Sequence, residues 1–339
     1  MKIIVDAMGG DNAPLEVVKG AIEARQNGDA EIILVGKGEE ILRCFEQMGV
    51  KDIPAGVELV NATEVIDAQE DPSTAIRHKK DSSLSVALGL LRDDRGDALV
   101  SAGSTGALLS GATLIVKRVR GVRRAALAPL IPNAAGGFVL IDCGANTECF
   151  PEYLMQFAYM GAFYAQDVLG INNPRVGLLN NGTEETKGTV LQLETYKLLE
   201  EAQRQSNLNF IGNVEAKDAM QGGCDVLVCD GFTGNILLKA IEGTASLIMS
   251  EFKDVFTSSA KTKLGYLLVK DKLSGLKNKL NPDVVGGTPL LGISKPVIKA
   301  HGSSGALAIT NAINQACVCA RANIASKLQS SLGQTKQEL

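Results

Sequence analysis

The chain has 339 residues, of which 45% are hydrophobic and 36 are glycine, and it carries a net charge of −4. This length and composition are typical of a soluble α/β protein with a large core, and they exclude a disordered or fibrous chain. The acidic balance, the 4% aromatic content and the lack of tryptophan argue against binding to DNA or RNA, which needs positive charge and stacking surfaces.

The start of the chain and its cysteines give expectations about location and chemistry. A strand pattern begins at Lys2, so we expect no signal peptide, and no apolar run reaches the ~18 to 20 residues of a membrane-spanning helix. We therefore expect a cytosolic protein. The seven cysteines form no CxxC pair and His78 and His301 are the only histidines, which predicts reduced structural thiols and no metal site. Cys229 could be a nucleophile, but its place in a strand pattern favours a small buried residue.

Short apolar segments alternate with helical patterns along the chain. Strands are predicted at 2–6, 31–35, 57–60, 97–101, 137–142, 175–179, 208–211, 225–229 and 296–299. This alternation predicts an α/β fold with a doubly wound, mostly parallel sheet. The last helix carries an apolar stripe from Ile309 to Leu328, and the polar tail at 331–339 is expected to be frayed. No linker divides the chain, so we predict one domain over 1–339.

One motif occurs twice, and each copy joins a predicted strand to an apolar helix. The copies span 97–109 and 225–237, and each contains a Gly-x-Thr-Gly turn, with Thr105 in the first and Thr233 in the second. Turn amides and a helix N-terminus direct unsatisfied N–H groups to one point, which suits a phosphate. The alternative is that each copy is an ordinary turn whose glycines only allow chain reversal. Because threonine recurs at the same place, we favour two anion-binding loops that serve one site.

Glycine-rich polar segments follow several of the predicted strands. In open α/β sheets the ligand lies beyond the carboxyl ends of the strands, so these loops predict the site. The loops are 6–11, 101–106, 180–188, 230–235 and 301–305. The segment 36–41 (GKGEEI) after the second strand lacks the third glycine of a dinucleotide fingerprint, and no Walker A sequence is present. The sequence therefore predicts a phosphate-handling site of another type, with no cofactor.

Six segments together resemble the bacterial phosphate acyltransferase family of phospholipid synthesis, and the resemblance runs over nearly the whole chain. They are 1–14 (MKIIVDAMGGDNAP), 77–83 (RHKKDSS), 101–106 (SAGSTG), 212–215 (GNVE), 230–235 (DGFTGN) and 299–304 (KAHGSS). The resemblance implies a homodimer with a three-layer α/β/α fold similar to phosphotransacetylases and the isopropylmalate dehydrogenase group. The family often has a histidine after Gly-Gly-Asp, where this chain has Asn12, so no histidine acts at that position.

The activity that the resemblance implies is reversible transfer of a fatty acyl group from acyl carrier protein to inorganic phosphate. A membrane glycerol-3-phosphate acyltransferase would then consume the acyl phosphate. Phosphate is a competent nucleophile and a thiolate of pKa about 8.5 is a good leaving group, so the protein needs to orient its substrates and stabilise charge. The expected catalytic residues are Lys187, Asn235 and His301.

The roles of these three residues differ, and two of them have alternatives. Lys187 is expected to offset charge as phosphate approaches. Asn235 is expected to donate to the thioester oxyanion, or else to cap a helix. His301 is expected to act as base or acid, or else only to order its loop.

Other residues are expected to bind anions or to line the cleft. Phosphate, or the phosphate of the carrier's phosphopantetheine, is expected to bind Gly103, Ser104, Thr105, Gly106, Gly231, Thr233, Gly234, Ser303 and Ser304. The further cleft residues are Asp6, Gly9, Gly10, Asp11, Asn180, Glu184, Glu215 and Asp230. Because carboxylates repel phosphate, Asp6 and Asp11 are expected to cap loops.

Two lysine-rich segments are candidates for contacts with partners. Lys79 and Lys80 are expected to dock acidic carrier protein, or else to form a solvated face. The segment 244–281 is predicted to form a projecting helical hairpin. Its part 261–280 holds six lysines, one acid and an apolar stripe that includes Leu264, Leu268, Leu273 and Leu276. We expect this hairpin to contact anionic lipid or the acyl chain, or else to pack in a dimer interface or the core.

Two other functions fit the same loops. A phosphotransacetylase-like enzyme would use acyl-CoA in place of acylated carrier protein, and a non-catalytic scaffold would bind carrier protein or lipid without turnover. The placement of Lys187, Asn235 and His301 in separate glycine-rich loops favours an enzyme over a scaffold, which needs no such convergence. A metal-dependent hydroxyacid dehydrogenase is disfavoured because the cofactor fingerprint is missing.

Overall fold

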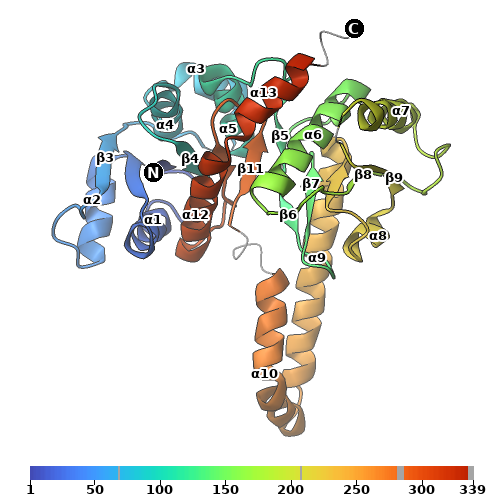
Figure 1. Ribbon diagram of the computed structural model, residues 1–339. Coiled ribbons are helices and arrows are strands. Elements are labelled where there is room, and N and C mark those ends of the chain that lie inside the picture. Colours follow the sequence, from blue (N-terminus) through green and yellow to red (C-terminus); the bar gives the residue numbers. More distant parts are fainter. Residues whose placement is uncertain (68, 207, 281–285, 335–339) are drawn as a thin grey trace.

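The strands form two sheets, one in each of two lobes (Figure 1). The structure, a computed structural model, describes residues 1–67, 69–206, 208–280 and 286–334. The first sheet has the order β3 (Val57–Asn61), β2 (Glu31–Gly36), β1 (Lys2–Asp6), β4 (Ala98–Ser101), β12 (Val297–Lys299), β11 (Thr288–Leu291) and β5 (Ala126–Leu127). The second has the order β6 (Leu130–Ile131), β7 (Phe138–Ile141), β10 (Val226–Val228), β8 (Val176–Leu179) and β9 (Phe210–Val214).

The predicted α/β class with mainly parallel strands is confirmed, and the structure divides these strands between two sheets. The strand predicted at 208–211 lies at Phe210–Val214. Three strands were not predicted, namely β5, β6 and β11, and all three pair in antiparallel fashion with their neighbours. Two of them have only two residues, which is too short for a periodic pattern, and β11 contains Pro289, which is unusual inside a strand.

Helices cover both faces of each sheet, as the alternation of side chains along a strand requires. In β1, Ile3 and Val5 pack with α1 (Leu15–Asn27) and α12 (Ala306–Ala322), whereas Ile4 packs with α4 (Ser83–Arg92) and α5 (Thr105–Gly111). The other helical segments of this lobe are α2 (Gly38–Gln47), α3 (Pro72–His78) and the π-helical η1 (Ala112–Val116). In the second lobe α6 (Pro151–Asp167) and α7 (Val190–Gln205) cover one face, and α8 (Ala216–Met220) and the start of α9 cover the other.

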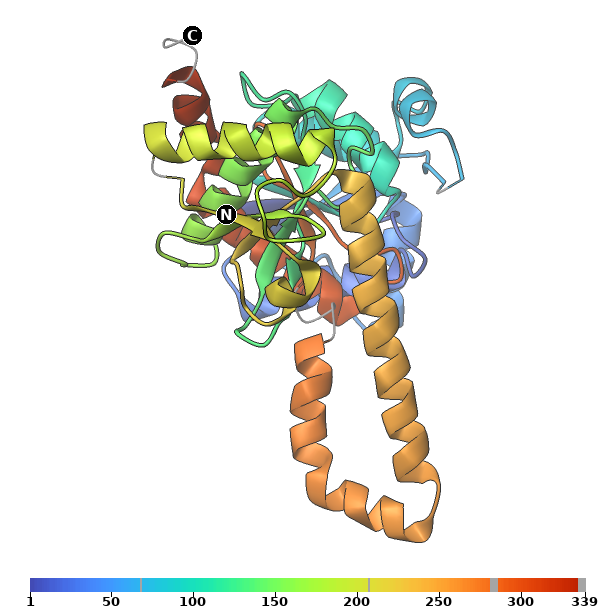
Figure 2. The same ribbon diagram turned by 90° about the vertical axis from the view of Figure 1, so that its right-hand side faces the viewer.

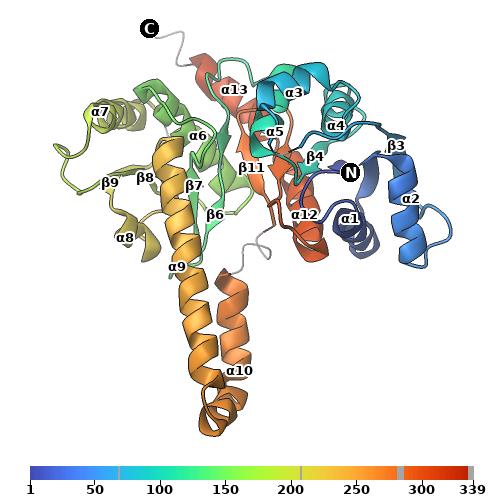
Figure 3. The same cartoon turned by 180° about the vertical axis from the view of Figure 1, so that it is seen from behind.

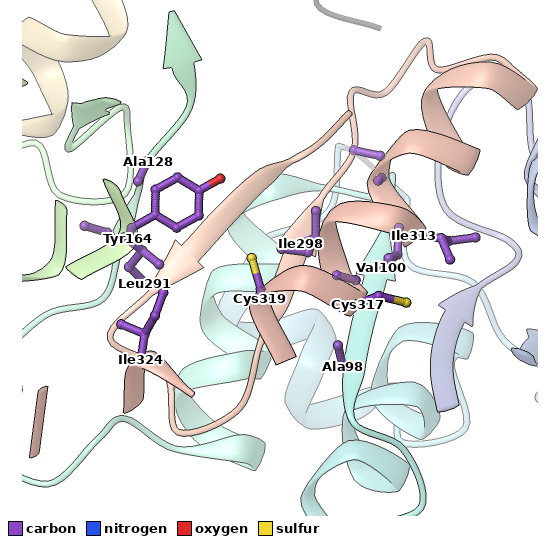
Figure 4. Packing of buried hydrophobic residues seen from close by; sticks show 14 of the residues in the cluster. Ala98, Val100, Ala128, Tyr164, Leu291, Ile298, Ile313, Cys317, Cys319 and Ile324 are labelled. Atoms are coloured by element: carbon purple, nitrogen blue, oxygen red, sulfur yellow. The ribbon is translucent and has the colours of Figure 1, made fainter. Parts of the chain in front are cut away.

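The two lobes share one continuous hydrophobic core (Figure 4). Tyr164 of α6 in the second lobe belongs to the same buried cluster as Leu291 of β11 and Ile313 of α12 in the first. The Tyr164 hydroxyl also accepts a hydrogen bond of 2.8 Å from Nε2 of Gln315. The two lobes therefore pack against each other through apolar side chains, and the single domain over 1–339 stays a prediction.

The last helix of the sequence prediction is two helices in the structure. The chain leaves α12 at Asn323, whose φ of 48° is left-handed, and continues in α13 (Ile324–Gln334). Asparagine adopts this conformation more readily than most residues, and the stripe that reads as one helix is therefore interrupted. The tail expected to be frayed from 331 is helical up to Gln334, and 335–339 lie outside the described residues.

The predicted hairpin projects from the second lobe (Figures 1–3). It consists of α9 (Gly231–Thr257) and α10 (Ala260–Leu280). Its first helix begins earlier than expected, directly in the second copy of the repeated motif, and residue 281 lies outside the described residues. None of the helices in the described part of the chain is long and apolar enough to cross a membrane.

An ion pair between Arg175 and Asp225 links the amino ends of the adjacent strands β8 and β10 in the second sheet. Arg175 donates to Asp225 from its backbone nitrogen at 2.8 Å, from Nε at 3.0 Å and from Nη2 at 2.9 Å. Burial raises the pKa of the Asp225 carboxyl, but the bonds from Arg175 outweigh this effect and hold the pKa below its usual value.

We expect Asp225→Asn to lower the free energy of unfolding at neutral pH by about 1 kcal/mol, allowing for the partial exposure of the pair. Because the pKa is depressed in the folded protein, the stabilisation is fully present above the ordinary Asp pKa and is lost as pH falls through the folded value. Urea unfolding curves of the two proteins should therefore converge in acid. Asp93→Asn is the control, because Asp93 pairs with its neighbour Arg92 on the exposed surface and this pair joins no two strands. Equal losses in both variants would contradict the prediction.

Candidate active site

Three loops leave the carboxyl ends of neighbouring strands in the first sheet. They follow β1, β4 and β12 and comprise residues 6–12, 101–106 and 299–304, here called the first loop set. The buried Asp6 carboxylate accepts from Oγ of Ser101 at 2.7 Å and from the backbone nitrogen of Met8 at 3.3 Å. A Cβ on Gly9 would lie 2.6 Å from the backbone nitrogen of Gly103, so the two loops approach too closely for a side chain there. Asp6 thus has the loop-stabilising contacts expected for it.

The third loop of this set is tied to the first by Asp11 and Asn12. The backbone nitrogen of Asp11 donates to the Gly302 carbonyl at 2.7 Å, and Nδ2 of Asn12 donates to the Ser303 carbonyl at 3.0 Å. His301 is exposed, and its Nδ1 lies 2.9 Å from Oγ of Ser303 and 3.3 Å from the backbone nitrogen of Ser303. This geometry matches the alternative role of His301, which is to order its own loop, and leaves its acid–base role as a prediction.

Two polar groups of the third loop lie partly or fully below the surface, the half-buried Lys299 and the buried Ser304. Nζ of Lys299 donates to the carbonyl oxygens of Ala102 and Ala300. Burial lowers the pKa of Lys299 to about 8, against the opposing effect of the carboxylates of Asp6 and Asp11. The Oγ atom of Ser304 is buried and makes no hydrogen bond within the described part of the chain. A buried hydroxyl without a partner is costly, so Ser304 is well suited to a ligand that completes its hydrogen bonding.

The two copies of the repeated motif lie in different sheets. In the first, Ser104 caps α5 by accepting from the backbone nitrogen of Ala107 at 3.4 Å. In the second, Asp230 caps α9 by accepting from the backbone nitrogen of Thr233 at 2.8 Å and from its Oγ1 at 2.7 Å. The strand, cap and helix arrangement is therefore common to both copies. The hydroxyl of Thr233 donates within its own loop, whereas Thr105 is exposed.

Three further loops leave the carboxyl ends of β7, β10 and β8, which are neighbours in the second sheet. They comprise residues 142–146, 229–235 and 180–188, here called the second loop set. Nδ2 of Asn180 donates to the Lys187 carbonyl at 3.0 Å, and Nδ2 of Asn213 donates to the Glu184 carbonyl at 2.8 Å. The first bond ties the two ends of the loop 180–188 together and the second holds its middle, while the side chain of Lys187 is exposed.

The sequence analysis did not propose the loop 142–146 as part of the site. In the structure its hydrogen bonds hold the carboxyl end of β7 in place. The buried Asp142 carboxylate accepts from the backbone nitrogens of Leu127, Cys143, Ala145 and Asn146 and from Nδ2 of Asn146, at 2.6 to 3.3 Å. Burial raises the pKa of Asp142, and these donors oppose that shift. A sequence signal exists, because Asp142-Cys-Gly-Ala-Asn146 is a polar, glycine-containing segment directly after the apolar strand pattern.

The loop 142–146 also positions the start of α9, which carries Asn235. The Asn146 carbonyl accepts from the backbone nitrogen of Gly231 at 2.7 Å, and Asn235 lies beside Gly144, where an added Cβ would be 3.6 Å from its Cγ. Asn235 is exposed and does not cap the helix, because Asp230 is the N-cap residue. The capping alternative for Asn235 is therefore wrong, and its amide is presented from the first turns of α9.

The expected site residues thus fall into two groups. Lys187 and Asn235 follow adjacent strands of the second sheet, whereas His301 and Ser304 belong to the first loop set. No hydrogen bond or ion pair links the two loop sets in the described ranges. Their convergence on one ligand stays a prediction.

The other candidates lie outside the two loop sets or are engaged in local contacts. Glu215 is the N-cap residue of α8 and pairs with Lys217 at 2.8 Å. Nζ of Lys79 lies 2.6 Å from a carboxylate oxygen of Glu70, so its charge is compensated within the fold, while Lys80 is exposed. Cys229 is buried, and burial raises its thiol pKa well above the usual value, which fits a structural residue.

The fold is that of the phosphotransacetylases. A phosphotransacetylase from Streptococcus pyogenes superposes with a TM-score of 0.65 and 20% sequence identity, covering 95% of this chain and 94% of that protein. This likeness confirms the α/β fold that the sequence predicts.

Sequence comparison identifies the family. The family model described as "Fatty acid synthesis protein" matches residues 1–327. A protein named phosphate acyltransferase from Brevibacillus brevis is 48% identical over 98% of this chain and 97% of its own length. Another of that name from Thermoanaerobacter pseudethanolicus is 50% identical over 93% of this chain and 92% of its own length. The chain belongs to this fatty acid synthesis protein family.

The contact between α9 and loop 142–146 leaves no room for a side chain at Gly234. A Cβ there would overlap the backbone carbonyl oxygen of Asp142, whereas a Cβ on Gly243, farther along the same helix, would meet nothing within 4 Å. We expect Gly234→Ala to lower the free energy of unfolding by about 1–3 kcal/mol, and Gly243→Ala to raise it by about 0.5–1 kcal/mol through its higher helix propensity. Urea unfolding of both variants checks this. A Gly234→Ala protein as stable as the wild type would refute the tight contact.

Proposed function

We propose that this protein transfers a fatty acyl group from a thioester to inorganic phosphate and so forms an acyl phosphate. The observation that carries the proposal is the pair of exposed side chains, Lys187 and Asn235, on loops that follow the adjacent strands β8 and β10. The family relatives named phosphate acyltransferase support the same reaction. One side chain supplies positive charge and the other an amide donor, which are the two groups that attack by an anion on a carbonyl needs.

The reaction proceeds by direct attack in this proposal. A phosphate oxygen forms a bond to the thioester carbonyl carbon, the tetrahedral intermediate collapses, and the carbon–sulfur bond breaks to release the thiolate. Lys187 offsets the charge of the approaching phosphate, and the Asn235 amide donates to the carbonyl oxygen as it gains negative charge. A covalent enzyme intermediate is not required. Six of the seven cysteines are buried, and burial raises the pKa of the half-buried Cys149 to about 12, which makes these thiols poor nucleophiles.

Anionic groups bind the first loop set in this proposal. The N-terminal turn of α5, with Ser104 and Thr105, offers backbone N–H groups, and the buried hydroxyl of Ser304 needs a partner. Nζ of Lys299 provides positive charge beneath the same loops. These features fit either inorganic phosphate or the phosphate of the donor's phosphopantetheine arm.

The acyl donor we propose is acyl carrier protein, with acyl-CoA as the alternative that the phosphotransacetylase fold favours. The acyl phosphate would pass to a membrane glycerol-3-phosphate acyltransferase for phospholipid synthesis. We further propose that the protein works as a homodimer in the cytosol and associates peripherally with the membrane through its projecting hairpin.

The hairpin exposes apolar side chains among its lysines. Leu264, Leu267 and Leu268 of α10 are 64%, 67% and 84% exposed, and Leu247 and Val255 of α9 are also exposed. Leu273 is half-buried, and Leu276 lies outside the side chains that the structure describes. Exposed leucines beside lysines suit the boundary of an anionic bilayer, where the leucines leave water and the lysines meet the headgroups.

The first test measures release of free carrier thiol from palmitoyl carrier protein at varied phosphate, with acyl phosphate trapped as the hydroxamate. We expect release to saturate with phosphate, and Lys187→Ala and Asn235→Ala each to lower kcat by about 10²–10³. Lys197→Ala, an exposed lysine of α7, is the control and should leave kcat unchanged. Carrier binding without phosphate-dependent turnover would support the scaffold function instead. Faster turnover of palmitoyl-CoA than of palmitoyl carrier protein would favour the phosphotransacetylase-like alternative.

The second test is flotation of the full-length protein with vesicles of phosphatidylglycerol and phosphatidylethanolamine. We expect Leu268→Glu to abolish flotation, because a buried carboxylate at the lipid boundary is unfavourable. Leu42→Glu is the control, since Leu42 is an exposed leucine of α2, far from the hairpin (Figure 1). Equal flotation of the wild type and the Leu268 variant, or a monomeric Leu268 variant of a dimeric wild type, would overturn membrane contact through this face.

A further inference from the structure

A polar cavity of about 460 Å³ lies between the segment 117–124 and the start of α6. It is lined by Arg118, Gly121, Val122, Arg123, Arg124 and Tyr153, here called the arginine pocket. Neither loop set contributes to its lining. The Arg124 guanidinium lies over the Tyr153 ring, 5.7 Å from its centroid, which gives one wall of the pocket a fixed arrangement.

The backbone of this pocket is held in place by buried contacts. Gln156 of α6, which is buried, accepts from the backbone nitrogen of Arg123 at 2.8 Å and donates to the Gly121 carbonyl at 3.1 Å. The backbone nitrogen of Val119 donates to the Gly292 carbonyl at 3.0 Å, and the Arg118 guanidinium donates to the Arg123 carbonyl. The charged side chains therefore extend from an anchored segment.

The segment concentrates positive charge that the fold does not neutralise. Its eight residues include Lys117, Arg118, Arg120, Arg123 and Arg124, all of which are exposed. None of these five pairs with a carboxylate in the ranges that the structure covers, although the chain as a whole has a net charge of −4. Lys79, by contrast, is paired with Glu70. Like charges crowded in this way repel one another, so an acidic partner would be attracted to this surface.

The arginine pocket is connected through loop 142–146 to the loop that carries Asn235. Ala125, the residue after Arg124, accepts from Nδ2 of Asn146 at 2.8 Å. The carbonyl of Asn146 in turn accepts from the backbone nitrogen of Gly231 at the start of α9. A partner bound at the pocket would therefore sit beside the residues that are proposed to handle the thioester.

We propose that the arginine pocket, together with the exposed Arg120 of the same segment, docks the acidic face of the carrier protein that presents the acyl thioester. This inference rests on the proposed function, and it assigns docking to Arg118, Arg120, Arg123 and Arg124 rather than to Lys79. Guanidinium groups form paired hydrogen bonds with carboxylates, and several of them on one open surface suit a row of acidic side chains. Nucleic acid is a poorer match, because Tyr153 is the single aromatic ring in the lining and bases have little surface on which to stack.

The test compares Arg120→Glu/Arg123→Glu with the wild type and with Arg43→Glu/Arg204→Glu, which carries the same change of charge on α2 and α7. In the first variant the altered guanidinium groups make no hydrogen bond in the described part of the chain, so we expect the fold to be retained, as unfolding curves would show. Binding of holo carrier protein to the full-length enzyme is measured by biolayer interferometry at low and high salt. We expect the Kd for holo carrier protein and the KM for palmitoyl carrier protein to rise at least about tenfold in the first variant only. The difference in binding between this variant and the wild type should be smaller at high salt, because salt screens the charges.

A second substrate separates docking from chemistry. Turnover of palmitoyl-pantetheine, which lacks the protein part of the donor, should be the same in all three proteins. Loss of that turnover in the first variant, an increase in KM for phosphate alone, or carrier binding equal to the wild type would each overturn the docking proposal. If the wild type shows no phosphate-dependent transfer, the proposed function fails, whereas the binding measurement still decides whether the pocket holds carrier protein.

Discussion

A buried carboxylate stands where the two sheets meet, and the arrangement of the site depends on it. Asp142 follows β7 in the second sheet and accepts from the backbone nitrogen of Leu127 in β5, an edge strand of the first. Its remaining donors form the loop 142–146, against which α9 begins. A charge buried in this way is tolerated only when its oxygens are fully hydrogen-bonded. The same contacts therefore fix the junction of the lobes and the position of Asn235.

The close approach of backbone segments follows from this junction. The start of α9 lies so near to Asp142 that Gly231 and Gly234 leave no space for side chains. Two loops of the first lobe approach each other in the same way, since Gly9 lies against the backbone of Gly103 and leaves no space for a side chain. Glycines thus let the loops approach one another, and the longer side chains of Lys187, Asn235 and His301 extend to solvent from the packed backbone. An enzyme that acts by orienting two substrates needs this rigidity more than it needs a reactive side chain.

Charge and apolar surface are distributed unevenly over the molecule. The segment of the arginine pocket contacts loop 142–146 through Ala125, while the hairpin projects from the body of the protein (Figure 2). The hairpin carries exposed leucines and lysines. Both features extend from elements that connect to the Asn235 loop, one through Ala125 and Asn146 and the other through α9 itself. The arginine pocket lies at the junction of the two lobes, since its segment 117–124 leads into β5 of the first sheet and Tyr153 belongs to α6 of the second lobe, so it and the hairpin are separate surfaces.

Local pattern was sufficient for much of the fold and for part of the site. The sequence by itself determined the α/β class, nine of the strands, the projecting hairpin and the loops that carry Lys187 and Asn235, because periodicity and turn residues act over short distances. It did not determine β5, β6, β11 or the division into two sheets, which depend on pairing between distant segments, nor the break at Asn323, which depends on a left-handed backbone conformation. The junction that Asp142 makes with Leu127 and the arginine pocket likewise depend on the tertiary structure. The reason is physical: the bond from Leu127 to Asp142 joins segments of two different sheets, and a run of arginines stays unpaired only where no carboxylate of the described chain folds beside it. Only the tertiary structure decides which residues are near.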